Sequence, residues 1–428
     1  MSELISNEEM KLRYIFAALL ACCMGVQAQE RAEVPVSADE FLALVCRGNL
    51  SLASEKLNVP IAQAEARAAA VFADPSLSLE YANNDDHRMQ MGQSFSAELG
   101  YTISPGKRGA RVNLAKSEAA LAEALLEDYL RNLRLEASTA YYETVRLGEL
   151  MEQARLLAEV MSAVAATDSM RHAVGNIRPA DAMQTRLEAN VAVADYIAAC
   201  NDYDNARLAL AAYTGPSEST PVYYTPTGTL DFEEPLYAVD ELVAGALERR
   251  ADLVAALKNV DVARKALTVE GKERNLDFEV ALGYNYNTEV RNELAPAPRF
   301  SGMTVGVTVP LPFSNSNKGA LTAARLRAEQ AEIDYQRARQ EVQTQTVQAY
   351  NDYVAAGKRA QAVGKMAAEQ SREVFEAYRR SYTAGDIDIN DFLDIVHNYT
   401  DVATMAIDSR AARIAALLAL RHTAAISE

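Results

Sequence analysis

The stretch from Ser94 to Leu126, SFSAELGYTISPGKRGARVNLAKSEAALAEALL, contains both kinds of segment from which this chain is built. From Phe95 to Ile103 apolar and polar side chains alternate, which predicts a strand with one apolar and one polar face. Pro105 interrupts that pattern, and an Ala-rich and Leu-rich segment follows. Its apolar residues stand three and four positions apart with charged residues between them, which is typical of an amphipathic helix.

The helical pattern is unusually long. From Val112 to Ala173 there is no proline and one glycine, and a helix of that length would extend roughly 90 to 100 Å at 1.5 Å per residue. A second such segment, of the same expected length, covers Ala320 to Thr383. Because an isolated long helix has no core in which to bury its apolar stripe, neighbouring helices must pack along it as in a coiled coil.

The chain aligns with itself. At a shift of 201 residues Asp39 meets Asp240, and nearer the end, at a shift of 210, Gly175 meets Gly385. Each copy is expected to contain a helix of about 35 residues, two strands, a helix of about 65 residues, a Gly-containing turn and another helix of about 35 residues. The predicted repeats are residues 29–215 and 239–428, and the Pro-containing segment 216–238 is a linker or small irregular subdomain.

Alternation recurs in three further segments, residues 77–81, 278–286 and 303–309. Such strands fit either a soluble sheet packed on helices or a membrane barrel. In lipid no sheet edge can stay open, and four strands cannot close around a lumen, so several chains would have to share one barrel. An eight-stranded barrel is filled by its own side chains, which favours three chains and about twelve strands for a conducting pore.

The amino end predicts export. Lys11 and Arg13 precede an apolar run from Tyr14 to Val26, and Ala28 ends a small-residue cleavage site, so residues 1–28 are a predicted signal peptide. Cys22 follows a sequence that resembles a lipobox, and acylation of Cys22 is the alternative processing. The acidic residues before Met10 leave open whether Met1 or Met10 is the true start.

Composition excludes several classes of function. The net charge of -17 disfavours a nucleic-acid partner and is compatible with a cationic cargo. After residue 30 no window is apolar enough for a spanning helix. The scattered histidines and the distant Cys46 and Cys200 form no metal pattern and no expected disulfide. With no nucleophile and base pair and no phosphate loop, we expect neither an enzyme nor a bound cofactor.

Two pairs of segments resemble the outer-membrane efflux protein (TolC) family along essentially the whole mature chain. Residues 103–109, ISPGKRG, and 309–319, VPLPFSNSNKG, look like the strand-to-helix junctions of its cation-efflux branch. Residues 174–177, VGNI, and 378–387, YRRSYTAGDI, look like the tips of its helical hairpins.

That resemblance implies a mainly α fold with a β-barrel portion. A homotrimer would combine a shared 12-stranded transmembrane barrel with a periplasmic barrel of long coiled-coil helices. Its function would be that of a passive exit duct in the outer membrane, serving a tripartite efflux pump. The implied partners are a periplasmic adaptor protein and an inner-membrane pump.

Candidate site residues come from the two tips and the two junctions. The tips are assigned to adaptor contact or gating, with the residues Gly175, Asn176, Asp181, Gly385, Asp386, Asp388 and Asp391. Aspartates at the second tip would repeat in a trimer as rings that favour cations; the alternative is that they cap helix amides. At the junctions proline ends the strand and glycine is expected to permit a sharp turn, at Pro105, Gly109, Pro310, Pro312 and Gly319.

Two other functions remain open at this point. A periplasmic adaptor also carries a helical hairpin, but one hairpin inside β-rich domains, whereas this chain has two hairpins and four good strands. A secreted coiled-coil scaffold would carry a small soluble sheet and would not need detergent for extraction. The junctions favour metal ions as cargo, but the sequence does not separate metal ions from drugs or other small molecules.

Overall fold

We describe the fold from a computed structural model, which describes residues 32–86, 89–215, 222–232, 235–311 and 317–426. The predicted signal peptide, Cys22 and Pro312 lie outside these residues. None of the helices in these ranges combines the length and the apolar character that a helical membrane crossing requires.

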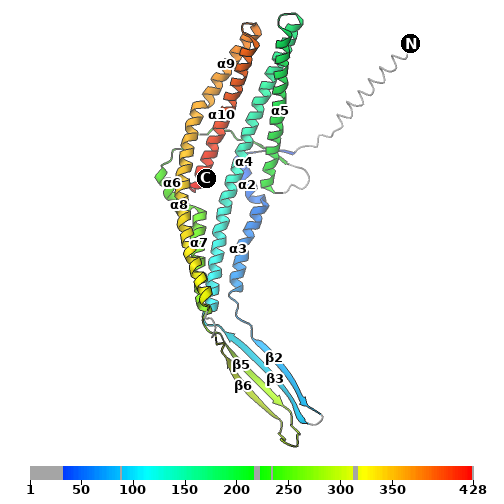
Figure 1. Cartoon of the computed structure of the whole chain (residues 1–428), viewed down its shortest axis with the longest axis vertical. Coiled ribbons are helices and arrows are strands. Elements are labelled where there is room, and N and C mark those ends of the chain that lie inside the picture. Colours follow the sequence, from blue (N-terminus) through cyan, green and yellow to red (C-terminus); the bar gives the residue numbers. More distant parts are fainter. Residues whose placement is uncertain (1–31, 87–88, 216–221, 233–234, 312–316, 427–428) are drawn as a thin grey trace, which may run out of the picture. The chain divides into compact units, whose positions relative to one another are not determined.

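The described elements occur twice in the same order (Figure 1). The first set consists of α2 (Ala38–Gly48), α3 (Leu50–Ala68), β2 (Ser76–Asp85), β3 (Gln90–Ile103), α4 (Lys107–Ala173) and α5 (Pro179–Thr214). The second set consists of α6 (Val239–Arg249), α7 (Ala251–Glu273), β5 (Phe278–Asn287), β6 (Phe300–Thr308), α8 (Lys318–Val363), α9 (Lys365–Ala384) and α10 (Ile389–Thr423). The mainly helical class and the four predicted strands are confirmed.

The sequence pattern suggested one continuous helix at the start of each copy. In the structure that helix is divided into two, α2 and α3 in the first copy and α6 and α7 in the second. The breaks fall at Asn49 and Arg250, whose backbone ψ angles of 117° and 124° are extended. Both side chains cap the last helix of their own copy: Asn49 Nδ2 donates to the Tyr213 carbonyl at 3.1 Å, and an Arg250 guanidinium nitrogen lies 3.5 Å from the Thr423 carbonyl. A helix end has unpaired carbonyls that such donors satisfy. The two breaks therefore position the side chains that cap the last helix of each copy.

The two long helices also differ. Helix α4 runs unbroken for 67 residues, as predicted, but the equivalent segment divides at Gly364 into α8 and α9, which is a correction to the single long helix expected there. The shift between copies rises across this region from 209, at Gly148 and Gly357, to 210 at the tips. The second copy therefore has one extra residue, which would rotate a continuous helix by about 100°. An interruption at Gly364 absorbs it.

The four long strands form one antiparallel sheet in the order β2-β3-β5-β6 (Figure 1). The central pairing joins the hairpins of the two copies, with Leu99 opposite Leu282 and Phe95 opposite Tyr286. A second, parallel sheet pairs β1 (Ala32–Val36) with β4 (Val222–Pro226), and this sheet was not predicted. The segment read as a linker thus contributes a strand.

Two compact units divide the described residues, and each takes segments from both copies. Unit one draws on the described residues within 32–49, 136–232 and 356–415; unit two draws on the described residues within 50–135, 235–355 and 416–426. Unit one contains both helix tips and the parallel sheet, and unit two contains the four-stranded sheet. The repeat boundaries remain a prediction from sequence.

An apolar core in unit one joins helices of both copies. It combines Met161 and Val164 of α4 with Phe375 and Tyr382 of α9 and Phe392 of α10. The rings of Tyr382 and Phe392 stack with their centroids 4.8 Å apart, and those of Phe375 and Tyr399 stack at 4.7 Å. Aromatic stacking of this kind adds to the stabilisation from burial. The helix tips are therefore supported by a well-packed apolar core.

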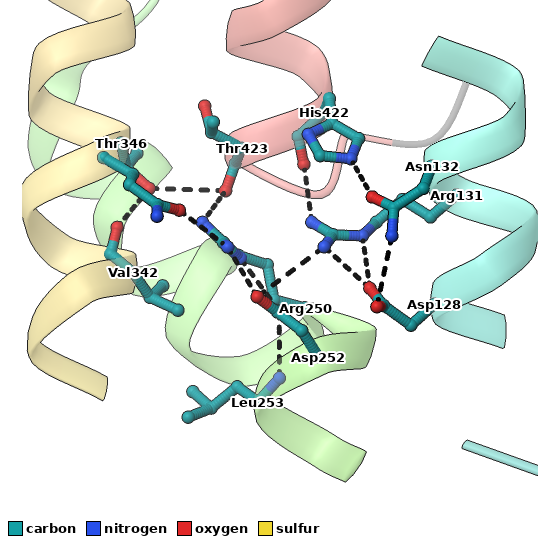
Figure 2. Close-up of polar contacts among 11 residues, drawn as sticks. Asp128, Arg131, Asn132, Arg250, Asp252, Leu253, Val342, Thr346, His422 and Thr423 are labelled. Carbon is teal, nitrogen blue, oxygen red and sulfur yellow. Dashed lines mark hydrogen bonds and ion pairs between the residues drawn. The ribbon is translucent and has the colours of Figure 1, made fainter. Parts of the chain in front are cut away.

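In unit two a polar cluster holds the end of α10 (Figure 2). Arg131 donates to the His422 carbonyl at 3.2 Å and pairs with Asp128 at 2.7 Å. Arg250 is buried and pairs with Asp252 at 2.6 Å. A buried arginine is tolerated because carboxylates and carbonyls satisfy its donors.

His422 belongs to the same cluster. Its Nε2 lies 2.9 Å from Asn132 Oδ1, whose amide nitrogen donates to Asp128, so this orientation makes Nε2 the protonated nitrogen (Figure 2). Burial, and then the positive charges of Arg131 and Arg250, lower the pKa of His422 to about 4. The imidazole is therefore neutral at pH 7.

Candidate functional sites at the helix tips and on the strand sheet

Both helix tips have the same backbone construction. Gly175 and Gly385 have φ angles of 78° and 88°, in the left-handed region that glycine adopts without strain. The amide of the next residue reaches back five positions in each case, from Asn176 to the Arg171 carbonyl and from Asp386 to the Ser381 carbonyl, at 2.8 and 2.9 Å. Such a closure ends a helix abruptly, so the predicted glycines do set the two turns.

The polar side chains at the tips differ between copies. Asp388 accepts from the amides of Asn390 and Asp391 at 2.8 and 3.0 Å and so caps α10. At the first tip Arg178 holds Asp181 through two bonds of 3.0 Å. The hydrogen bonds that Arg178 donates to Asp181, the charge of Asp181 and the charge of Asp388 together raise the pKa of Arg178.

Capping was the alternative reading of the tip aspartates, and for Asp388 the geometry bears it out. Asp386, Asp388 and Asp391 nevertheless have exposed side chains. Asp388 caps and presents a charge to solvent at once, because a carboxylate has more lone pairs than the two amides use. Capping therefore does not remove these residues as candidates for a ring of charge.

A buried hydrogen bond just behind the tips was not anticipated from the sequence. The Tyr382 hydroxyl donates to Asp168 Oδ2 at 2.6 Å, and the Asp168 side chain is 1% exposed. Arg171 lies 3.4 Å from the same carboxylate and 3.4 Å from the Tyr382 carbonyl. Burial first, and then the bond and charge of Asp168, raise the pKa of Tyr382, so the phenol remains a proton donor.

This contact links α4 of the first copy to α9 of the second. We name Asp168, Arg171 and Tyr382 the interhelix latch. Sequence pattern could not reveal it, because Asp168 and Arg171 look like two of many charged residues on a long helix. The one available signal was the unusual position of an aspartate within the apolar stripe, between Val164 and the helix end.

The junctions correct one prediction. Gly109 and Gly319 were expected to permit sharp turns, but α4 begins at Lys107 and α8 at Lys318, so both glycines lie inside helices. The left-handed residues are instead Gly106, with φ of 79°, and Asn317, with φ of 57°. Each stands immediately before its helix, and a residue in that position turns the chain without interrupting the helix.

Lys107 anchors the first junction. Its ammonium lies 2.8 Å from Asp277 and 3.4 Å from Glu273, and its side chain is 7% exposed. Burial acts to lower the Lys107 pKa, but the hydrogen bond and charge of Asp277 and the charge of Glu273 outweigh it and raise the pKa. Pro105 lies in the turn before α4, and its carbonyl accepts from Asn275 at 3.0 Å. Pro310 follows the end of β6.

The four-stranded sheet has two chemically distinct faces. Register places the apolar residues of all four strands on one face, and most of these side chains are exposed. They include Leu77, Leu79, Tyr81, Leu99, Leu282, Tyr284, Met303, Val305 and Val307. Exposed apolar surface of this extent marks contact with lipid or with another protein.

The opposite face is polar and acidic. It carries Glu80, Glu98 and Glu279 among serines, threonines, asparagines and glycines, and none of the four strands contains Lys or Arg. A Cβ added at Gly100 would lie 2.4 Å from Glu279 Oε1, so the Glu279 carboxylate would have to shift. Small residues on this face therefore leave room for the carboxylates.

Among the described residues no group of His, Cys, Asp and Glu side chains is arranged to hold a metal ion. Cys46 and Cys200 are both unpaired thiols.

Comparison with known proteins agrees with the resemblance in the sequence. Residues 242–425 match the family model described as outer membrane efflux protein. The cobalt-zinc-cadmium resistance protein CzcC of Cupriavidus metallidurans is 25% identical over 362 residues, which cover 84% of this chain and 83% of that protein. Outer membrane protein TolC of Vibrio cholerae is 23% identical over 351 residues, covering 79% and 78%.

Solved structures show the same fold. The outer-membrane channel OprN superposes with a TM-score of 0.74 at 15% identity, over 90% of this chain and 89% of that one. The family model matches the second copy, and the two relatives span most of both copies, so this chain is similar to outer membrane efflux proteins along most of its length.

Proposed function

We propose that this chain forms the exit channel of an efflux pump in the outer membrane, passively conducting small solutes from the periplasm to the outside. The observation that carries the proposal is the sheet of four strands with one bare apolar face and one acidic face. Packed in a closed barrel, the apolar face would contact lipid and the acidic face would line a lumen.

Three copies supply the strands that such a barrel needs. Four strands leave two open edges, and lipid does not tolerate open edges, so chains must join edge to edge. A dimer would fill its own lumen with side chains, whereas a trimer leaves a pore. We therefore propose a homotrimer, which would meet a periplasmic adaptor at the helix tips and, through it, an inner-membrane pump.

The cargo that fits best is a metal cation. Glu80, Glu98 and Glu279 give the proposed lumen a negative charge that no Lys or Arg of the strands offsets. Such a lining raises the local concentration of cations and repels anions. The relative CzcC is named for resistance to cobalt, zinc and cadmium, three divalent cations.

We place the gate at the tips, with the interhelix latch as the element that keeps it closed. The latch joins helices of different copies, so an opening that separated the two hairpins would break it. Asp386, Asp388 and Asp391 would form the charged entrance once the tips part.

Conductance in a planar bilayer tests the channel. Detergent-extracted protein should form pores whose reversal potential in a salt gradient shows a preference for cations. Asn substitutions of Asp386, Asp388 and Asp391 together should reduce that preference, while Leu187→Asn on the exposed side of α5 should not. A protein that is extracted without detergent and forms no pores would contradict the proposal.

A further inference from the structure

Positive charge is concentrated where the helices of unit two meet its four-stranded sheet. The described residues of these junctions are 67–75, 104–111, 272–277, 309–311 and 317–320, which connect α3, α4, α7 and α8 to the strands (Figure 1). They contain seven Lys and Arg residues and three Asp and Glu residues, although the whole chain has a net charge of -17. One end of the sheet is therefore basic, while its strands carry acidic residues and no Lys or Arg.

Two of the acidic residues are already paired within the chain. Lys107 is buried between Asp277 and Glu273, and Arg111 lies 2.7 Å from Glu273. These ion pairs join the start of α4 to the end of α7. They leave the remaining bases of the junctions with an excess of positive charge, because Asp74 is the one other acidic residue there.

Three exposed bases near the turn before α4 have no carboxylate partner among the residues that the structure describes. They are Arg108, Lys272 and Arg274, and we name them the junction bases. A surface base normally interacts with water or with an anion that approaches it. The junction bases are therefore free to meet an anion from outside the chain.

Backbone contacts bring the ends of α7 and β3 together at this turn. The side chain of Lys272 lies against Gly106, where an added Cβ would be 3.5 Å from the Lys272 Cδ. Arg274 follows α7 directly, and the next residue, Asn275, donates to the Pro105 carbonyl at 3.0 Å. The two bases of the α7 end thus stand beside the turn that leads into α4.

Arg108 is held in a fixed orientation. Its guanidinium carbon lies 3.8 Å from the centroid of the Phe72 ring, and its Nε donates to the Ala70 carbonyl at 2.7 Å. The donors on its two terminal nitrogens have no partner among the described residues. A planar guanidinium that is already oriented binds a phosphate group through two parallel hydrogen bonds. Arg108 therefore presents a preformed fork for a phosphate.

Exposed apolar side chains accompany the junction bases. Val71 and Phe72 are 67% and 63% exposed, and Leu276 and Leu311 are 43% and 62% exposed. They lie just outside the strands, at the end of the sheet where its apolar face stops. An aromatic ring and a basic group next to bare apolar surface are typical of the boundary between hydrocarbon and lipid headgroups.

We propose that the junction bases bind anionic glycerophospholipids, with the phosphate on the Arg108 fork and the acyl chains along Val71, Phe72 and the apolar face of the sheet. The inference rests on the proposed place of the sheet in the outer membrane and names the lipid selected there. A free phosphate ion would use the bases but not the apolar residues beside them. A zwitterionic lipid carries an ammonium group that the same bases repel.

Native mass spectrometry of the full-length protein measures this selection. Delipidated protein in a nonionic detergent is mixed with equal amounts of phosphatidylglycerol and phosphatidylethanolamine that have the same acyl chains. One base near an anionic surface favours binding by roughly five-fold. We therefore expect phosphatidylglycerol to be retained at least about five-fold over phosphatidylethanolamine. Equal retention of the two lipids would overturn the proposal.

Substitutions locate the selection on the junction bases. Arg108→Gln removes the fork, and Lys272→Gln with Arg274→Gln removes the two charges of the α7 end. Each variant should reduce the preference for phosphatidylglycerol several-fold. The matched control is Arg186→Gln, which removes an exposed arginine of α5 in unit one and should keep the preference of the original protein. If all of these variants behaved alike, the junction bases would not be the site.

Two measurements guard against other causes. Circular dichroism shows whether Arg108→Gln still folds, and if it does not, the double variant of α7 decides the question. A large excess of inorganic phosphate should not release bound phosphatidylglycerol, because its acyl chains contribute to binding. Complete release by phosphate would show a site for the free ion and would overturn the lipid site. Loss of trimers in the double variant with an unchanged lipid preference would also overturn it, since the bases would then face a neighbouring chain.

Bilayer conductance on the same preparations separates this proposal from the channel. Conducting protein without a preference for phosphatidylglycerol would overturn the lipid site and leave the channel standing. Protein that selects phosphatidylglycerol but forms no pores would support the lipid site and count against the channel. Protein that is extracted without detergent and retains no lipid would contradict both.

Discussion

The Tyr382 hydroxyl is the group that makes the buried Asp168 carboxylate tolerable. A carboxylate with 1% exposure has lost its water, and this 2.6 Å bond and the more distant Arg171 replace it. The phenol ring also stacks on Phe392 at 4.8 Å. One residue thus combines packing of the tip core with a polar contact between copies.

Replacing Tyr382 with Phe separates these roles. The ring and its stacking remain, but Asp168 loses its donor, at a cost of about 1–3 kcal/mol. Any open state, in which water reaches Asp168, loses nothing, so the equilibrium should shift toward opening by roughly five-fold to a hundred-fold. Single-channel recording should show more frequent or larger openings.

Tyr399→Phe is the control for this change, because its ring stacks on Phe375 at 4.7 Å without taking part in the latch. Equal opening frequencies in Tyr382→Phe and Tyr399→Phe would show that the latch does not restrain the gate.

His422 makes stability depend on pH. Its folded pKa of about 4 is below the ordinary value near 6.5, so protons bind the unfolded chain more readily. The contribution of neutral His422 to the free energy of unfolding is intact above pH 6.5 and is lost as the pH falls from there toward 4. The full loss would be on the order of 3 kcal/mol per chain.

Thermal dissociation of the assembly, measured from about pH 8 to about pH 4.5, checks this linkage. His422→Gln keeps an amide that can donate to Asn132 but does not titrate, so its dissociation temperature should fall less steeply with acid. Parallel curves for the two proteins would show that other groups control the acid response.

At the scale of elements, the two faces of one strand should respond oppositely to the same charge. Val305 is 74% exposed on the apolar face of β6, and its neighbour Thr304 lies on the acidic face. In the proposed barrel Val305→Lys would place an ammonium in lipid at a cost of about 2–4 kcal/mol, whereas Thr304→Lys would face the lumen near Glu98. Only the first should reduce assembled protein in outer membranes.

Quantitative blotting of heat-modifiable protein in isolated outer membranes measures that difference. Thr304→Lys should instead weaken the cation preference. Similar membrane levels for both variants would contradict the assignment of the faces.

Elements differ in how far sequence predicts them. Strand alternation gives the faces of β2, β3, β5 and β6 correctly, because successive side chains of a strand point to opposite faces of the sheet. The absence of proline predicts α4 from Val112 to its end at Ala173, which misses only the first five residues from Lys107. Breaks at Asn49, Arg250 and Gly364 escape prediction, because each depends on a tertiary partner or on register between copies rather than on local propensity.

The same limit applies to the candidate sites. Gly175 and Gly385 were found because a left-handed turn demands glycine locally. Gly109 and Gly319 were misassigned, since a glycine near a helix start looks the same whether it makes the turn or follows it. Asp168 pairs with Tyr382 across 214 positions of sequence, and no local pattern can report such a contact.

At the scale of the whole molecule, assembly of the proposed homotrimer should depend on apolar side chains that are exposed in the single chain, such as those along α5. Ile197 is 62% exposed in the single chain, so Ile197→Asp removes nothing from its own fold. Where a neighbouring chain of the proposed homotrimer covers this face of α5, the carboxylate would be buried without a partner and would weaken association by several kcal/mol. Each trimer would contain that contact three times, which multiplies the effect. We therefore expect folded monomers in detergent, measured by light scattering with circular dichroism unchanged.

Leu187→Asp provides the comparison, because Leu187 is 61% exposed on another face of α5 and its equivalent, His397, is also exposed. That variant should remain trimeric. If Ile197→Asp were as trimeric as Leu187→Asp, the chains would have to associate through a surface other than this face of α5. If Ile197→Asp lost its helical signal as well, its effect would lie in folding, and Val193→Asn, a smaller polar change on the same face of α5, would separate the two causes.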